Sequence, residues 1–268
     1  MYPVLCDLDG VVWLAHRPIP GAAEAVAHLR SAGHRVLFVT NNSSARIEEQ
    51  EQYLAAIGIP AEGDVLTSAQ AGALLVEPGS TALVCAADGV VQALERRGVH
   101  VLDPASVGPT GDVPDVVVVG WHRTFDFDGL ARASTAVRRG ARLVATNDDA
   151  TYPTPDGQIP GGGAILAAVE TASGTSATIA GKPYEPMAAL VRAELGAAWS
   201  SDAVMVGDRP STDGRFARQL GCRYAQVWSG VTPRQTAVDP VPDLTADDLA
   251  GIVHLLTGGT VLPAGNHR

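Results

Sequence analysis

Two aspartates separated by one residue close the first apolar run of this chain, in Asp7-Leu8-Asp9-Gly10. Side chains at positions i and i+2 of an extended segment share a face, so both carboxylates can address one ligand. Two close anions repel each other, and a divalent cation placed between them and a phosphate would remove that cost. The alternative interpretation is a polar strand end that caps the next turn.

Hydroxyl and amide groups follow the second apolar run, in Thr40-Asn41-Asn42-Ser43. A helical pattern begins shortly afterwards, so these side chains and the free backbone N–H groups would form an anion cradle. Ser, Thr and Asn are also the preferred residues at helix N-termini, so a plain helix cap explains the same residues.

Lysine occurs once in the sequence, in Gly181-Lys182-Pro183, whereas the other 18 basic residues are arginine. The lysine ammonium is a compact point charge and the arginine guanidinium is a planar fork, so the two are not interchangeable. A chain that uses arginine elsewhere is therefore expected to need an ammonium at Lys182. A solvated loop lysine is the alternative.

The fourth motif, VGDRPSTD over residues 206–213, follows another apolar run. Asp208 and Asp213 stand five residues apart around the start of a helical pattern. One carboxylate would bind a metal ion directly, and the other would hold the water of the metal or orient the lysine. A helix N-cap with an acid in the first turn, where the helix dipole favours it, is the alternative.

The motifs follow short apolar runs, which are typical of strands buried on both faces. The runs cover residues 4–8, 36–40, 81–86, 116–120, 143–146, 204–207 and 224–228. Helical spacing separates them at residues 22–31, 48–57, 69–76, 90–97, 130–139, 164–171, 186–195 and 212–220. This alternation predicts an α/β fold with parallel sheet. Two loop-rich regions, 77–80 and 173–181, indicate that a cap is inserted into a discontinuous core.

Length and composition exclude several classes of protein. The 268 residues, 46% hydrophobic and 18% charged, fit one large or two modest folded domains. The net charge of -10 argues against nucleic-acid partners and anionic lipid surfaces. Cys6, Cys85 and Cys222 lack metal-site spacing, and we expect them to be reduced. The sequence has no signal-peptide or membrane-span pattern, so we expect a cytoplasmic protein with no membrane partner; a homodimer is compatible with it.

In their order along the chain, DLDG, TNNS, GKP and VGDRPSTD resemble the four signature motifs of the haloacid dehalogenase (HAD) superfamily. They most resemble the NagD-like and 4-nitrophenylphosphatase-like phosphatases, which include glycerol phosphate and phosphoglycolate phosphatases. The resemblance extends over about residues 4–232. It implies a Rossmann-like, doubly wound parallel sheet core of residues 1–78 and 179–268, with an inserted α/β cap of the C2 type at residues 79–178.

The resemblance also implies a role for each motif residue in a phosphomonoesterase that acts on a small-molecule phosphate ester. Asp7 would be the nucleophile, and Asp9 would protonate the leaving alcohol and then activate water. The Mg²⁺ cofactor would be held by Asp7, the backbone carbonyl of Asp9 and Asp208, with Asp213 in support. The phosphoryl oxygens would be bound by Thr40, Asn41, Asn42 and Lys182.

This chain departs from the family pattern at three places. Pro210 and Gly214 replace residues that are often Leu and Ile, and Trp121-His122 stands where Leu-Asp is common. The cap supplies contacts to the leaving group, and we expect specificity residues at Tyr152, His122 and Asn147.

Four other functions compete with this interpretation. A phosphoryl-transferring mutase or a dehalogenase would share the fold, but Asp9 argues against a dehalogenase, which has no leaving alcohol to protonate. A phospho-accepting receiver module would be about half as long and would not turn over. A dinucleotide-binding dehydrogenase would need a glycine fingerprint that Val119-Gly120-Trp121-His122 does not supply.

Overall fold

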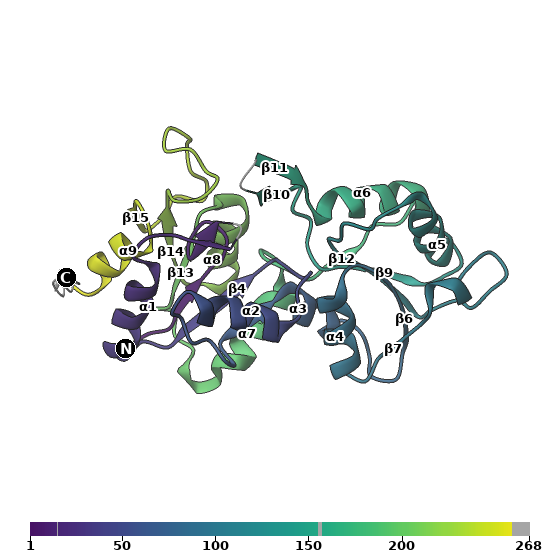
Figure 1. The fold of residues 1–268 in the computed structure, drawn as a ribbon, viewed down its shortest axis with the longest axis horizontal. Coiled ribbons are helices and arrows are strands. Elements are labelled where there is room, and N and C mark those ends of the chain that lie inside the picture. Colours follow the sequence, from purple (N-terminus) through teal and green to yellow (C-terminus); the bar gives the residue numbers. More distant parts are fainter. Residues whose placement is uncertain (15, 155–156, 259–268) are drawn as a thin grey trace.

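The computed structural model describes residues 1–14, 16–154 and 157–258. Two parallel β-sheets with flanking helices form two lobes side by side, and the N-terminus and the last described helix, residues 249–256, lie in the same lobe (Figure 1). The 259–268 part of the C-terminal tail lies outside the described residues. No helix in the described part of the chain is both long and apolar enough to cross a membrane.

The first sheet contains six parallel strands in the order β15-β14-β13-β1-β4-β5. These are β1 (Val4–Cys6), β4 (Val36–Thr40), β5 (Val65–Thr67), β13 (Val204–Gly207), β14 (Arg223–Val227) and β15 (Leu244–Ala246). The central strand β1 pairs on both sides, with Val4 opposite Val36 and Val204. All of β1, β4 and β13 is buried, which explains their continuous apolar sequences.

Helices cover both faces of this sheet. One face packs against α1 (Ala22–Ser31), α2 (Ile47–Ala56) and α9 (Leu249–Leu256). The other packs against α7 (Glu185–Leu195) and α8 (Arg215–Leu220). This layering leaves the carboxyl edge of the strands for loops, where ligands bind in open α/β sheets.

The second sheet contains five parallel strands in the order β12-β9-β8-β6-β7. These are β6 (Thr81–Cys85), β7 (His100–Val101), β8 (Val116–Val119), β9 (Arg142–Ala145) and β12 (Thr178–Ile179). Its faces are covered by α3 (Ser68–Leu74) and α4 (Asp88–Arg96) on one side, and by α5 (Phe127–Arg138) and α6 (Gly162–Ser173) on the other. Its strands all come from residues 81–179, so this sheet is built from an insertion into the first.

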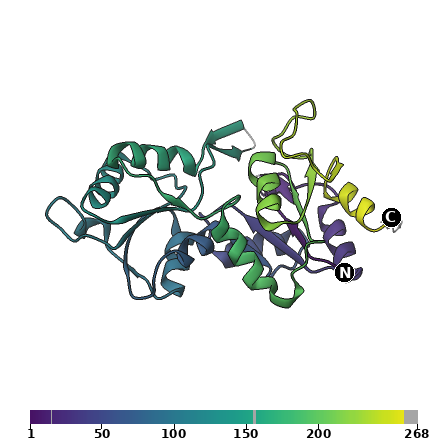
Figure 2. The same cartoon turned by 180° about the vertical axis from the view of Figure 1, so that it is seen from behind.

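Two antiparallel hairpins decorate the lobes: β2 (Trp13–Leu14) with β3 (Arg17–Pro18), and β10 (Thr151–Thr154) with β11 (Gly157–Pro160). In both views the β10–β11 hairpin extends from the second lobe toward the first (Figures 1 and 2). Short helical turns occupy Pro104–Ser106, Gly196–Ala198 and Pro210–Gly214.

The predicted α/β class with a Rossmann-like core is confirmed, and every predicted strand and helix has a counterpart. We propose the two sheets as the two predicted domains. The second domain boundary then lies after Ile179 rather than before it, because Ile179 pairs with Ala145 of the second sheet. The helix predicted at 212–220 starts three residues too early, since α8 begins at Arg215 after the turn Pro210–Gly214.

Candidate active site

The four sequence motifs meet at the carboxyl edge of the first sheet. Asp7 follows β1, Thr40 ends β4 and Asp208 follows β13, while Lys182 lies on the connection from β12 to α7. Together they line one pocket with residues from the second lobe. The lining residues are Asp7, Asp9, Leu14, Thr40, Asn41, Asn42, Ser43, Trp121, Asn147, Asp149, Thr151, Tyr152, Pro153, Gly161, Gly162, Lys182, Asp208, Arg209, Thr212 and Val231.

Lys182 is buried between two carboxylates. Its Nζ lies 2.8 Å from Oδ1 of Asp7 and 2.8 Å from Oδ1 of Asp213. Burial lowers the pKa of Lys182, but the charges of Asp213 and Asp7 outweigh it and the net pKa is raised. Lys182 is therefore a fixed positive charge inside the site, and a solvated loop lysine is excluded.

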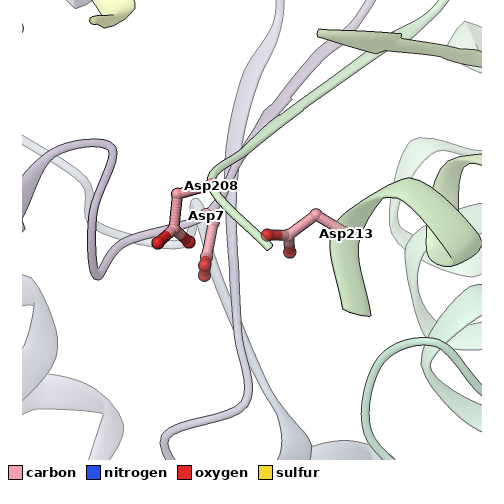
Figure 3. Close-up of side chains that lie close together, drawn as sticks. All are labelled: Asp7, Asp208 and Asp213. Carbon is pink, nitrogen blue, oxygen red and sulfur yellow. The ribbon is translucent and has the colours of Figure 1, made fainter. Parts of the chain in front are cut away.

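Three carboxylates cluster around this ammonium. Oxygens of Asp7, Asp208 and Asp213 lie within 4.8 Å of one another. Figure 3 shows Asp7 and Asp208 at neighbouring strand ends, with Asp213 directed toward them from the adjacent helical turn. Burial raises the pKa of Asp7 well above its usual value, and burial together with the charge of Asp213 raises the pKa of Asp208 to about 7. The cluster carries more negative charge than one lysine balances.

The donor set fits a hard divalent cation such as Mg²⁺, because the three carboxylates offer only oxygen ligands. Oδ2 of Asp208 accepts a 2.7 Å hydrogen bond from the backbone N–H of Val231. The backbone of Gly230 lies so close that a Cβ there would be 2.0 Å from the same oxygen. The loop after β14 thus holds the Asp208 carboxylate in place.

Asp213 is fixed by the turn in which it lies. Its Oδ2 accepts the backbone N–H of Arg209 at 3.0 Å while its Oδ1 meets Lys182. A Cβ at Gly207 would be 2.2 Å from the Cβ of Asp213, so glycine lets the turn fold against β13. Gly214 packs similarly close to Tyr224 and accounts for this departure from the family pattern. With both oxygens engaged by the protein, Asp213 serves to position Lys182.

The second motif connects the two lobes at the base of the pocket. Oδ1 of Asn41 accepts the backbone N–H of Lys182 at 2.8 Å, and Nδ2 donates to its carbonyl at 3.0 Å. Thr40 Oγ1 accepts the backbone N–H of Asn42 at 3.0 Å. Asn147 Nδ2 donates to the carbonyl of Asn41 at 2.8 Å. The amides of Asn41 and Asn147 therefore fix the loops around Lys182.

Asp9 and Tyr152 face the same part of the pocket from different lobes. Both line it, and burial together with the charge of Asp9 raises the pKa of Tyr152. Asn42 Nδ2 donates to the hydroxyl of Tyr152 at 3.3 Å. The ring of Tyr152 stacks on Trp121, with centroids 4.8 Å apart and an interplanar angle of 17°.

His122 does not share this pocket. It lines a separate hollow with Cys85, whose Sγ lies 3.7 Å from Nε2 of His122. Burial lowers the pKa of His122. The structure therefore does not bring His122 to the pocket that Tyr152 and Asn147 line, and its predicted contact with the leaving group stays a prediction. Its neighbour Trp121 lines the pocket instead.

Two residues of the pocket were not among the site residues predicted from the sequence. Arg209 and Asp149 line the pocket and lie 4.0 Å apart, although they come from different lobes. Arg209 stands inside the fourth motif, and Asp149 lies in an Asn- and Asp-rich turn. Their sequence signals are ordinary, because only the fold brings them together.

Two family models match the chain. "Haloacid dehalogenase-like hydrolase" matches residues 4–100, and "HAD-hydrolase-like" matches residues 179–252. The gap between the two matches contains most of the second sheet. The motifs that carry the resemblance all lie inside the matched segments.

Named relatives cover nearly the whole chain. A D-glycerol 3-phosphate phosphatase from Mycobacterium tuberculosis is 36% identical over 246 residues, 89% of this chain and 66% of that protein, so this chain spans just under two thirds of that relative. An acid sugar phosphatase from Staphylococcus saprophyticus is 34% identical over 235 residues, 86% of this chain and 88% of that protein.

A solved structure is also similar to this chain in its three-dimensional fold. The crystal structure of a glycerol phosphate phosphatase from Mycobacterium tuberculosis in complex with magnesium matches with a TM-score of 0.83 and 33% identity, over 93% of this chain and 75% of that one. The motifs, the two lobes and these matches agree. The chain belongs to the haloacid dehalogenase-like hydrolases, and the relatives named here are phosphatases of that family.

Proposed function

We propose that this chain is a Mg²⁺-dependent phosphomonoesterase that hydrolyses a small phosphorylated metabolite. The observation that carries the proposal is the buried ammonium of Lys182, held 2.8 Å from both Asp7 and Asp213 at the edge of a parallel sheet. Phosphoryl transfer needs positioning and charge neutralisation more than covalent chemistry by the protein, and this arrangement suits both. The phosphatase relatives support the same reaction class.

Asp7 acts as the nucleophile. Its Oδ1 is bound by the backbone N–H of Leu8 and by Lys182, so we assign the attack to Oδ2. A new bond forms between Asp7 and phosphorus while the ester bond to the alcohol breaks, and Asp9 gives the leaving oxygen its proton. Water then attacks the phosphorus, Asp9 takes a proton from it, and phosphate leaves with Asp7 regenerated.

Lys182 and Thr40 bind the phosphoryl oxygens, together with backbone N–H groups of the loop after β4. The side chain of Asn41 holds both backbone groups of Lys182 and so fixes the ammonium where charge develops. Asn42 in turn binds the hydroxyl of Tyr152 and links this loop to the cap.

The Asp7 and Asp208 carboxylates and the backbone carbonyl of Asp9 would hold Mg²⁺. When bound, Mg²⁺ would neutralise the carboxylates and the phosphoryl group, which lets one anion approach another. Asp213 contributes through Lys182, because its two oxygens are bound by Lys182 and by the backbone N–H of Arg209.

Phosphate release tests the proposal. The full chain is incubated with 4-nitrophenyl phosphate and with a panel of phosphorylated metabolites, with Mg²⁺ or with EDTA. We expect Mg²⁺-dependent release of phosphate from at least one phosphomonoester. A receiver module would accept a phosphoryl group without turnover, and a mutase would transfer it within the substrate. No release from any ester would overturn the proposal.

A further inference from the structure

Acidic side chains outnumber basic ones in the pocket. In the described part of the chain its lining includes four aspartates, Asp7, Asp9, Asp149 and Asp208, and two cations, Lys182 and Arg209. Lys182 is committed to Asp7 and to Asp213 behind it. Arg209 is therefore the lining cation to which an anionic group on the leaving alcohol would have to bind.

Asp149 already lies next to Arg209 as its ion-pair partner. Its Oδ1 lies 4.0 Å from Nη1 of Arg209, and its Oδ2 accepts a 2.9 Å hydrogen bond from Nδ2 of Asn41. The amide thus holds the Asp149 carboxylate near Arg209, and both side chains are largely buried, with 22% and 20% of their surface exposed. Solvent screening between them is reduced at this depth.

We infer that Asp149 makes this pocket select phosphomonoesters whose leaving alcohol is uncharged, such as a polyol, over those whose alcohol carries a carboxylate or a second phosphate. This inference rests on the proposed function. A bound divalent cation balances the charges that line the pocket, and the phosphoryl dianion makes the total negative again. A further anion would meet Asp149 as a like charge, with Arg209 already neutralised.

The rest of the lining agrees with an uncharged leaving group. Leu14, Trp121, Tyr152 and Pro153 contribute apolar surface. The Tyr152 hydroxyl adds a hydrogen-bonding group beside Asn42 without adding charge. Such a wall suits the carbon chain and hydroxyl groups of a polyol.

Two pairs of substrates with the same carbon skeleton test the selection. Glycerol 3-phosphate is compared with 3-phosphoglycerate, and 2-hydroxyethyl phosphate with phosphoglycolate, so that each pair differs by a hydroxymethyl group and a carboxylate. We expect kcat/KM of the wild type to favour the neutral member of each pair by about tenfold or more, the size of one like-charge contact at this depth.

Variants assign the selection to Asp149. Asp149→Asn should reduce the preference about tenfold, because the negative charge is lost and Arg209 is freed to bind a carboxylate. Arg209→Gln should increase it. Asp148→Asn is the matched control, since Asp148 is exposed and binds Tyr184 instead, and it should leave the preference unchanged. Asp149→Glu, which keeps the charge, should retain most of it.

Hydrolysis of 4-nitrophenyl phosphate separates this inference from the proposed function. If it is turned over but the wild type hydrolyses both members of each pair equally, or if folded Asp149→Asn keeps the full preference, the inference is wrong and the phosphatase assignment stands. If no ester is hydrolysed, the proposed function itself fails.

Discussion

Lys182 and Asp213 form an ion pair in the interior of the protein, with Nζ and Oδ1 2.8 Å apart and side chains 1% and 0% exposed. Removing one partner of such a pair leaves the other charge buried without compensation. Here the ammonium also meets Asp7 on its other side. The pair therefore contributes to stability as well as to the proposed chemistry.

Replacing the lysine tests both contributions. Lys182→Met should abolish turnover and lower the free energy of unfolding by about 3 to 5 kcal/mol in urea denaturation, because Asp7 and Asp213 then face each other unpaired. The control is Arg192→Ala, which breaks the exposed pair of Arg192 with Glu185 on α7. That substitution should lower the free energy of unfolding by at most about 1 kcal/mol. Equal losses in the two variants would contradict a buried pair.

Chemical labelling probes the burial of the single lysine. An amine-reactive ester should label the exposed N-terminal amine of Met1 quickly and leave Lys182 unlabelled in the native protein, since Lys182 is inaccessible and its raised pKa keeps it protonated. Peptide mass mapping reads both sites in one sample. Urea should expose Lys182 to the reagent. Rapid labelling of Lys182 without denaturant would show that the site opens to solvent.

The unbalanced carboxylates predict how stability responds to metal. Mg²⁺ should raise the melting temperature of the wild type. Asp208→Asn should lose this shift yet melt at or above the metal-free wild type, because a carboxyl whose folded-state pKa is raised to about 7 destabilises the fold once it ionises. The advantage of the variant should be larger at pH about 8 than at about 5, since the penalty grows as pH rises toward the folded-state pKa.

The exposed Asp202 provides the control for this experiment. Asp202→Asn should keep the wild-type response to Mg²⁺. A full metal-induced shift in Asp208→Asn would place the metal away from this carboxylate cluster.

Trp121 and Tyr152 should influence the leaving group while His122 should not. Tyr152→Ala removes the ring that stacks on Trp121 and the hydroxyl bound by Asn42, and we expect kcat/KM for the natural substrate to fall about tenfold or more, roughly 1.4 kcal/mol. The kcat/KM for 4-nitrophenyl phosphate should change much less. His122→Ala, in the neighbouring hollow, serves as the control and should retain the wild-type value.

The strands were predictable where the whole segment is buried, because a short continuous apolar run is then typical of a buried strand. The run 36–40 is buried along its length and its bounds match β4, and 204–207 matches β13. The strands β12 and β10–β11 escaped prediction because they are two and four residues long and contain polar residues or proline, so their pairing depends on distant partners.

The residues of the candidate site also fall into a group that the sequence predicts and a group that depends on the tertiary fold. Asp7, Thr40 and Asp208 were predictable because each stands at the end of a buried strand, and a parallel sheet brings those ends together. Lys182 was predictable because it is the single lysine of the sequence. Which side chain of Trp121-His122 enters the pocket depends on how the chain leaves β8, and the spacing of residues cannot decide it. The approach of Asp149 to Arg209 depends on how the two lobes meet.

The central claim is that Asp7 takes the phosphoryl group. The direct measurement is rapid acid quench of the wild type with excess phosphomonoester and Mg²⁺, followed by mass spectrometry of the peptide that contains Asp7. We predict a phosphorylated, acid-stable and base-labile Asp7 in the wild type. Asp7→Asn should show no adduct and lose activity by several orders of magnitude, whereas Asp9→Asn should form the adduct with turnover reduced about 10²- to 10⁴-fold. Near-normal turnover by Asp7→Asn, or a phosphoryl group on another residue, would contradict the account.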